Sequence, residues 1–377
     1  MKAVVTVRNS SFHKYTSLGN VSMLIDELDE VVVPEKEKSQ FAAEYLDSDF
    51  RWGGDEMIFV QKPDPGVFLE IAEAFPHYWP SDELKGIISN VRWSQLDCLF
   101  RVFDSDGFEK SMSGNGIRSA ASYLHTKLHK SNLTMLAEIP SGVPREKPVE
   151  CTWAGNFKVN MGPAINPPSM FMDERARKAI KEHEYIFLVG PEVVPVPDSE
   201  VHKPLTCFFT YVGEPDLVIF CGERQPSYAG QDLDIIVKDF FRVGAAEQDA
   251  RTHENSFRSV GRHFNDLPLF PRGVNVNFVA VTKDDQLLLR SFARGINREL
   301  MASGTGAAAS ALIAKYLGLT KEREVPVKPR GGIFEFSAAG KKQSVYQGVL
   351  KVSVTRDTII LEGPATQVFK GDLERGP

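Results

Sequence analysis

Two serine–glycine turns are the residues in this sequence best placed to do chemistry. Residues 113–124 read SGNGIRSAASYL and residues 303–312 read SGTGAAASAL, and each turn opens a segment rich in Ala and Ser. We therefore expect Ser113 and Ser303 to cap two helices. The first N–H groups of a helix lack intrahelical acceptors and lie at the positive end of its dipole, so they can bind a carboxylate or a phosphate. Alternatively, each serine is only a helix cap, which contributes about 1 kcal/mol.

The elements around these turns predict a mixed α+β chain. The two turns lie in opposite halves of the sequence, which favours two related lobes. Strand-like stretches are frequent and do not alternate strictly with helices. The expected strands are Val4–Val7, Val21–Ile25, Met57–Val60, Cys98–Phe103, Val218–Cys221, Val274–Val281, Leu287–Phe292 and Leu350–Val354. The expected helices are Val67–Ala74, Gly116–Leu128, Leu233–Val243 and Thr305–Leu317.

Composition narrows the class of protein. The chain has 377 residues, a net charge of −6, 42% hydrophobic and 25% charged residues, which are values typical of globular proteins. Its length suggests two or three folding units. A pI near 5.8 with scattered basic residues argues against nucleic acid as a partner. We expect no membrane partner and no secretory signal, because no apolar run reaches about 18 residues and the N-terminus lacks an apolar core.

Cofactor and metal signatures are missing from the sequence. The four cysteines have no CxxC or metal spacing, which predicts free thiols in a reducing, cytoplasmic setting. The eight histidines show no HxH or HExxH spacing, so we expect no metal site. No dinucleotide fingerprint occurs in a strand–helix context, and no Walker lysine follows either turn. We therefore expect a small-molecule protein without a cofactor.

The motifs, taken in order, resemble the diaminopimelate epimerase family, which has the fold of the PLP-independent amino-acid racemases and isomerases. The matching segments are FHKYTSLGNVSMLIDE (12–27), RWGGDEMIFV (51–60), RVFDSDGFEKSMSGNGIRSAA (101–121), YVGEPDLVIF (211–220), FPRGVNVNFVAV (270–281) and SFARGINRELMASGTGAAASA (291–311). The resemblance implies two pseudo-symmetric lobes, each a curved, mostly antiparallel sheet around a central helix. The N-terminal lobe would span residues 1–138, with strands of 344–371 returning to it, and the C-terminal lobe would span 149–343.

The sequence departs from the family where the chemistry occurs. The family has a cysteine in each turn, one taking the α-proton and the other returning one, whereas this chain has Ser113 and Ser303. A thiol has a pKa of about 8.5, and a serine hydroxyl is a much weaker acid that needs an adjacent base. We therefore do not expect two-thiol racemisation, and both serines are interpreted as hydrogen-bonding groups at the catalytic positions.

The resemblance also implies a set of substrate-binding residues. The backbone of both turns would hold the reacting carboxylate, and Asn20, Asn275 and Arg294 match positions that hold the far end of the substrate. Asp104 and Glu214 replace family asparagines, Asp216 replaces a histidine, and Ala293 replaces an acid. The full expected binding set is Asn20, Gly114, Asn115, Gly116, Glu214, Asn275, Arg294, Gly304, Thr305 and Gly306.

Two hypotheses follow for the carboxylates. Asp104 and Asp106 are candidate replacement bases, although such loop acids are more often solvated. Asp104 and Glu214 would also favour a ligand with a basic side chain, since a buried carboxylate needs a partner. The alternative is that both acids pair with Arg294 or a nearby lysine and never meet a ligand.

Two functions remain open from the sequence. The favoured one is an isomerase or tautomerase of amino-acid metabolism and biosynthesis, which acts on a small amino acid or a derived imino or unsaturated acid in a cleft between the lobes. The other is a non-catalytic homologue that binds such a compound for a partner enzyme. A homodimer is compatible with either function.

Overall fold

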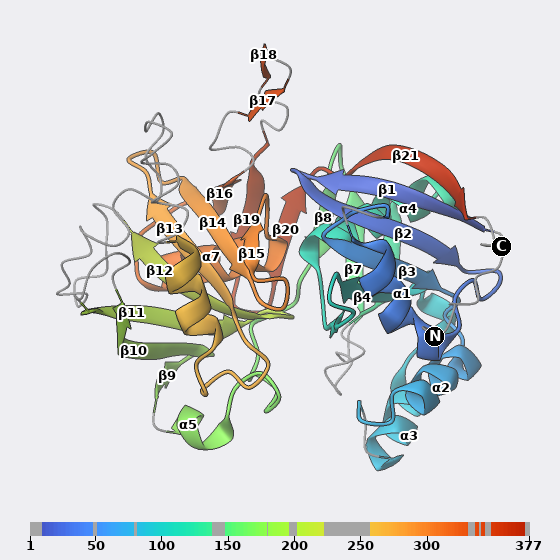
Figure 1. Ribbon diagram of the computed structural model, residues 1–377, viewed down its shortest axis with the longest axis horizontal. Helices are drawn as coiled ribbons and strands as arrows, with labels where there is room; N and C mark the ends of the chain where they lie inside the picture. The colour runs from blue at the N-terminus through green and yellow to red at the C-terminus, as the bar shows by residue number, and fades with distance from the viewer. Residues whose placement is uncertain are drawn as a thin grey trace. The chain divides into compact units, whose positions relative to one another are not determined.

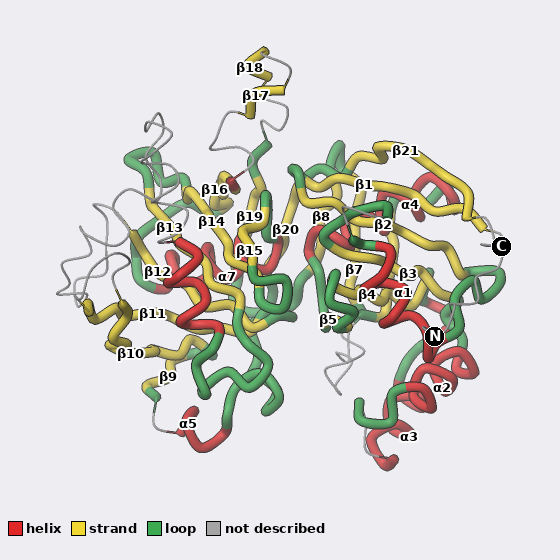
Figure 2. Tube along the Cα trace, viewed as in Figure 1, coloured by secondary structure: helices red, strands yellow, loops and turns green. Residues whose placement is uncertain are grey.

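The fold is a mixed α+β architecture, as expected. The computed structural model describes residues 10–47, 51–78, 81–137, 148–178, 180–195, 202–221, 257–330, 336–338, 341–343 and 348–373 (Figure 1). Two compact units divide the chain: unit 1 is Met1–Asn160 with Gly363–Pro377, and unit 2 is Met161–Glu362. Strands form much of each unit (Figure 2).

Unit 1 is one twisted sheet with helices on both of its faces. Its helices are α1 (Lys38–Tyr45), α2 (Pro65–Ala74), α3 (Ser81–Asn90) and α4 (Gly114–Leu128), with 3₁₀ turns at Glu35–Glu37 and Trp93–Gln95. Its strands are β1 (Ser10–Ser17), β2 (Asn20–Glu27), β3 (Glu56–Gln61), β4 (Cys98–Asp104), β5 (Glu109–Lys110), β6 (Asn132–Leu136), β7 (Val149–Trp153), β8 (Phe157–Asn160) and β21 (Thr366–Leu373).

Unit 2 also has one large sheet with helices on both faces, and its β17 and β18 form a separate two-stranded sheet. Its helices are α5 (Glu174–Lys178), α7 (Gly304–Tyr316) and a helical segment over 257–265. Its strands are β9 (Lys181–His183), β10 (Ile186–Pro195), β11 (His202–Tyr211), β12 (Pro215–Cys221), β13 (Asn275–Val281), β14 (Leu287–Ala293), β15 (Arg298–Leu300), β16 (Glu324–Pro329), β17 (Phe336–Ala338), β18 (Lys341–Gln343), β19 (Leu350–Val354) and β20 (Ile359–Gly363).

The strand pairing of unit 1 is repeated in unit 2. From β1 to β4 the pairings are antiparallel, parallel and antiparallel, and from β11 to β14 they are the same. Strand β4 then pairs with the short β5 at one end and runs parallel to β6 at the other, as β14 does with β15 and β16. Each short strand leads into a long helix, α4 or α7. The two related lobes inferred from the serine turns therefore have matching topology.

Each sheet has two different faces because side chains alternate along a strand. In unit 1, Met23, Phe59 and Phe103 pack with Phe41 of α1 in an apolar core. The intervening residues face α4, which contacts strands across the sheet. In unit 2, Leu217, Phe278 and Phe292 belong to the core with Phe257, and the intervening residues face α7.

The division into units differs from the expected one at two places. Strands β7 and β8 extend the edge of β6 by antiparallel pairing, so unit 1 runs on to Asn160. Strands β19 and β20 stay with β16 in unit 2, and only β21 returns to unit 1, where it pairs with β1. The expected strand Val4–Val7, the expected helix Leu233–Val243 and the expected boundary at 139–147 lie outside the described residues.

Other sequence expectations can be compared directly with the described elements. The remaining expected strands and helices coincide with β2, β3, β4, β12, β13, β14, β19, α2, α4 and α7. Cys98, Cys151, Cys207 and Cys221 are buried free thiols. No helix in the described part of the chain is long and apolar enough to cross a membrane.

Candidate functional site

Both serine turns begin helices as the sequence predicted. Ser113 and Ser303 have extended backbones, with φ, ψ of −139°, 114° and −126°, 120°, and each is an N-cap. Ser113 Oγ accepts from Gly116 N at 2.9 Å, and Ser303 Oγ accepts from Gly306 N at 3.1 Å. Both turns are buried, with the side chains of Asn115 and Thr305 about 5% exposed or less. Each turn therefore carries the backbone N–H groups of the first helical residues, which have no acceptor within the helix.

A buried arginine–glutamate pair holds the strand before each turn. Arg101 Nε and Nη2 donate to Glu109 at 2.7 and 2.6 Å, and Arg290 Nε and Nη2 donate to Glu299 at 2.6 and 2.7 Å. Both are bidentate pairs, which fix geometry more firmly than a single contact. Each glutamate lies four residues before its serine. The two turns are thus anchored in the same way.

Charged side chains surround the first turn. Lys110 Nζ pairs with Asp104 Oδ1 at 2.7 Å and with Glu56 Oε2 at 3.2 Å. Ser22 Oγ donates to Glu56 Oε1 at 2.7 Å. A Cβ built on Gly116 would lie 3.0 Å from Glu56 Oε1, so this carboxylate is directly beside the turn. The expected candidate Asp104 is therefore part of an ion-paired cluster in unit 1.

Asp106 and Asn20 have very different positions. Asp106 is exposed in the turn between β4 and β5, where its Oδ1 accepts from Phe108 N at 2.9 Å. The structure places Asp106 outside the ion-paired cluster of Asp104, Lys110 and Glu56.

Asn20 is 3% exposed and lies opposite Ser17, whose Oγ donates to the carbonyl of Asn115. Opposed residues share a face, so Asn20 faces α4, and its Oδ1 accepts no hydrogen bond from the described residues.

Arg118 supports the first turn from within α4. It is fully buried, and its Nη2 donates to Asn115 Oδ1 at 2.8 Å. Burial lowers the pKa of this guanidinium to about 10, and the carboxylate of Glu56 opposes the shift. This contact agrees with a structural role in packing the turn.

A chain of hydrogen bonds from Ser291 through Asn277 to Asp216 lies beside the second turn. Asn277 Nδ2 donates to Asp216 Oδ1 at 2.8 Å, and Ser291 Oγ donates to Asn277 Oδ1 at 2.7 Å. A Cβ on Gly306 would lie only 2.2 Å from Asn277 Oδ1, so glycine is required for this close approach. Asp216 Oδ2 is buried and has no hydrogen-bond partner among the described residues.

Burial strongly perturbs the carboxyl of Asp216. The loss of hydration raises the pKa of Asp216 to about 7, a rise that the hydrogen bond from Asn277 reduces and the charge of Glu214 increases. A carboxyl with this pKa exists in both protonation states at neutral pH. Such a group can both accept and return a proton.

The distal residues of unit 2 form an ion pair. Glu214 Oε2 accepts from Arg294 Nε at 2.9 Å and from Nη2 at 2.6 Å, and both side chains are about 4% exposed or less. Asn275 Oδ1 accepts from the backbone N–H of Arg294 at 3.2 Å. The argument for a basic ligand was wrong on this point, because Glu214 pairs with Arg294 and Asp104 pairs with Lys110. Each of these two acids therefore has a cationic partner within the chain.

Several residues of these clusters were not among the expected site residues. Asp216 was noted only as a substituted histidine, and Glu56, Lys110 and Asn277 were not singled out. The available signal was alternation, since Asp216 and Asn277 are polar residues within otherwise apolar strands and must face the opposite side from the core. Among the described residues, no three His, Cys, Asp or Glu side chains are grouped to hold a metal ion.

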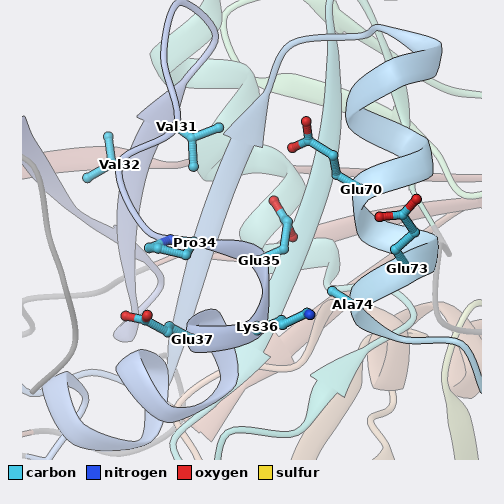
Figure 3. A pocket seen from close by; sticks show the side chains of 9 residues that line it. All are labelled: Val31, Val32, Pro34, Glu35, Lys36, Glu37, Glu70, Glu73 and Ala74. Atoms are coloured by element: carbon cyan, nitrogen blue, oxygen red, sulfur yellow. The ribbon is translucent and has the colours of Figure 1, made fainter. Parts of the chain in front are cut away.

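A separate pocket of about 590 Å³ lies within unit 1, and no residue of the first turn lines it. Val31, Val32 and Pro34–Glu37 line one side, and Glu70, Glu73 and Ala74 of α2 line the other (Figure 3). Its most buried acid, Glu35, is tied to Arg101, Lys38 and Gln61. This carboxylate is therefore engaged inside the protein.

Comparisons with known proteins agree on one group of relatives. No family model matches the chain. The chain is 27% identical over 367 residues to a diaminopimelate epimerase of Methanothermobacter thermautotrophicus, covering 97% of this chain and 99% of that protein. It is 28% identical over 366 residues to a diaminopimelate epimerase of Methanocaldococcus jannaschii, covering 96% and 98%.

A solved structure supports the fold. A hydroxyproline epimerase from Agrobacterium vitis, with trans-4-hydroxy-L-proline bound, aligns with a TM-score of 0.56 at 10% identity, covering 98% of this chain and 94% of that one. The arrangement of strands and helices is thus shared despite very low identity.

Proposed function

Because this chain belongs to a diaminopimelate epimerase-like family, we propose that it is a cofactor-independent isomerase that moves a proton on a small amino acid or on a derived imino or unsaturated acid. The family relationship supports an isomerase. The serines in both turns exclude the use of two thiols at these positions, so another group must transfer the proton. Asp216 in unit 2 is our candidate.

The second serine turn would hold the substrate carboxylate. The first N–H groups of α7 are unsatisfied within the helix, and the helix dipole favours an anion there. Hydrogen bonds to a charged group contribute about 1.5–3 kcal/mol each. Ser303 Oγ accepts from Gly306 N, so its hydroxyl hydrogen takes no part in that bond and can be donated to substrate.

The observation that carries the proposal is the state of Asp216. Its Oδ1 is held by Asn277, its Oδ2 is buried without a partner, and its pKa is raised by burial to about 7. A general base works best when its pKa lies near the working pH. Deprotonated Asp216 would take a proton from the carbon next to the substrate carboxylate, and the resulting acid would return it.

Solvent exchange tests this function without knowledge of the natural substrate. The purified protein is incubated in D2O with each common L-amino acid and with L-vinylglycine (2-aminobut-3-enoate), in the presence of EDTA and without added cofactor. Proton NMR measures deuterium entry at carbon. We expect at least one compound to exchange. Tight binding of a compound by calorimetry without any exchange would instead favour the accessory role, and neither binding nor exchange would contradict both.

A further inference from the structure

The repeated topology makes it possible to compare the two serine turns residue by residue. Phe103 pairs with Glu109 and with Met57, and Phe292 pairs with Glu299 and with Val276. These pairs place Glu56 and Asn275 at equivalent positions, one residue before Met57 and Val276. Glu56 pairs with Ser22, and Asn275 pairs with Asp216.

Ser22 is therefore the counterpart of Asp216. The same register makes Asn20 the counterpart of Glu214, Asp104 that of Ala293, and Lys110 that of Leu300. The backbone of the two halves and their arginine–glutamate pairs are repeated, but the ionisable groups at these four positions are not. A carboxyl lies at one of the two equivalent positions and a serine hydroxyl at the other.

The carboxylates of unit 1 have a different arrangement from Asp216. Glu56 and Asp104 share the Lys110 ammonium group, and Glu56 also accepts from Ser22. Asp216 Oδ1 accepts from the neutral amide of Asn277, and the hydroxyl of Thr305 also lowers the pKa of this carboxyl. By distance and angle, Asp216 Oδ2 accepts no hydrogen bond from the described residues. Glu56 and Asp104 are held in ion pairs, whereas Asp216 keeps one buried oxygen without a hydrogen bond from the described residues.

Inversion at a carbon of a substrate held in one orientation requires two acid–base groups, one on each side of that carbon. The resemblance implies that the two cysteines of the family's turns form such a pair. This chain has no equivalent pair at its two turns in the described residues. We infer that it transfers its proton through the single carboxyl of Asp216, so that the proton leaves and returns on the same face of the substrate. The substrate class is then an unsaturated or imino amino acid that undergoes a proton shift rather than an amino acid that is epimerised.

The proposed step is balanced without a co-reactant. The Asp216 carboxylate takes the proton from the carbon that bears the substrate carboxylate. The C–H electron pair forms a double bond to the neighbouring carbon, the original double bond moves its electrons to the far carbon, and Asp216 returns the proton there. The inference rests on the proposed isomerase function.

A labelled unsaturated amino acid tests the step directly. L-vinylglycine carrying deuterium at Cα is incubated with the protein in H2O. A same-face shift gives 2-aminobut-2-enoate, which tautomerises to the imine and is hydrolysed by water to 2-oxobutanoate and ammonium. We expect mass spectrometry and NMR to find part of the deuterium in the C4 methyl group of 2-oxobutanoate, and we expect recovered vinylglycine to retain the L configuration.

Each outcome separates the inference from the function. Product formation without deuterium at C4, or formation of D-vinylglycine, would overturn the single-carboxyl step while leaving an isomerase in place. If vinylglycine is inert, chiral chromatography of any amino acid that exchanges in D2O decides the point: exchange with retained configuration supports the inference, and racemisation overturns it. Absence of exchange from every compound would remove the proposed function and the inference with it.

Discussion

Gly306 is a position where the second serine turn leaves no room for a larger side chain. In Gly306→Ala the new Cβ would lie 2.2 Å from Asn277 Oδ1 and 2.8 Å from Ser303 Oγ. The Asn277 amide would have to move, although it accepts from Ser291 and donates to Asp216. Overpacking costs about 1–3 kcal/mol, and a disrupted buried hydrogen bond costs a further 1–3 kcal/mol or so. We expect Gly306→Ala to lower the free energy of unfolding by about 2–6 kcal/mol.

The repeat provides matched controls for this variant. In Gly116→Ala the nearest atoms are Glu56 Oε1 at 3.0 Å and Phe100 Cζ at 3.1 Å, so we expect a loss of only about 1 kcal/mol. Gly86 in α3 has nothing within 4 Å, and Gly86→Ala should stabilise the helix by about 0.5–1 kcal/mol. Urea unfolding followed by circular dichroism gives all three values. A loss for Gly306→Ala no larger than that for Gly116→Ala would refute the close packing of the second turn.

Two further variants test the charged groups. Burial raises the pKa of Asp216 from about 4 in the unfolded chain to about 7, so the folded state binds the extra proton and Asp216 makes stability fall between about pH 4 and pH 7, by about 4 kcal/mol at 1.36 kcal/mol per pKa unit. In urea unfolding, the free energy of unfolding of Asp216→Asn should therefore rise relative to that of the wild type, by up to this amount, as the pH increases. A difference between the two proteins that does not change with pH would contradict the raised pKa. Lys110→Met removes the cation shared by Glu56 and Asp104, so we expect a loss of about 3–5 kcal/mol, partly recovered by adding Asp104→Asn. A double-mutant cycle that shows no coupling would argue against this ion pair.

Local signals in the sequence were sufficient for the helix starts. A serine cap followed by glycine placed the first residues of α4 and α7 within two residues of Gly116 and Thr305, because capping depends on neighbours in the chain. Two other helices of unit 1 were missed. In α1 a buried Lys38, paired with Glu27 and Glu35, interrupts the apolar pattern, and in α3 an exposed Gly86 lowers helix propensity.

The partners of the buried acids could not be predicted from the sequence. Glu214 and Arg294 are far apart in the chain and meet only because β12, β13 and β14 are neighbours in one sheet. The raised pKa of Asp216 could not be predicted either, because it depends on complete burial of the side chain between β11, β13 and α7. Charge counting without the strand register therefore missed the cations that pair with Glu214 and Asp104.

The most direct test of the central claim is the rate of carbon–deuterium exchange in Asp216→Asn, measured against the wild type and against Gly86→Ala as a control outside the site. Asparagine keeps the size of the side chain and its contact with Asn277 but cannot take a proton. A general base contributes about 10²–10⁴-fold to the rate. We predict a loss of that size in Asp216→Asn, with correct folding by circular dichroism and with Gly86→Ala unchanged. Exchange by Asp216→Asn at the wild-type rate would contradict the account.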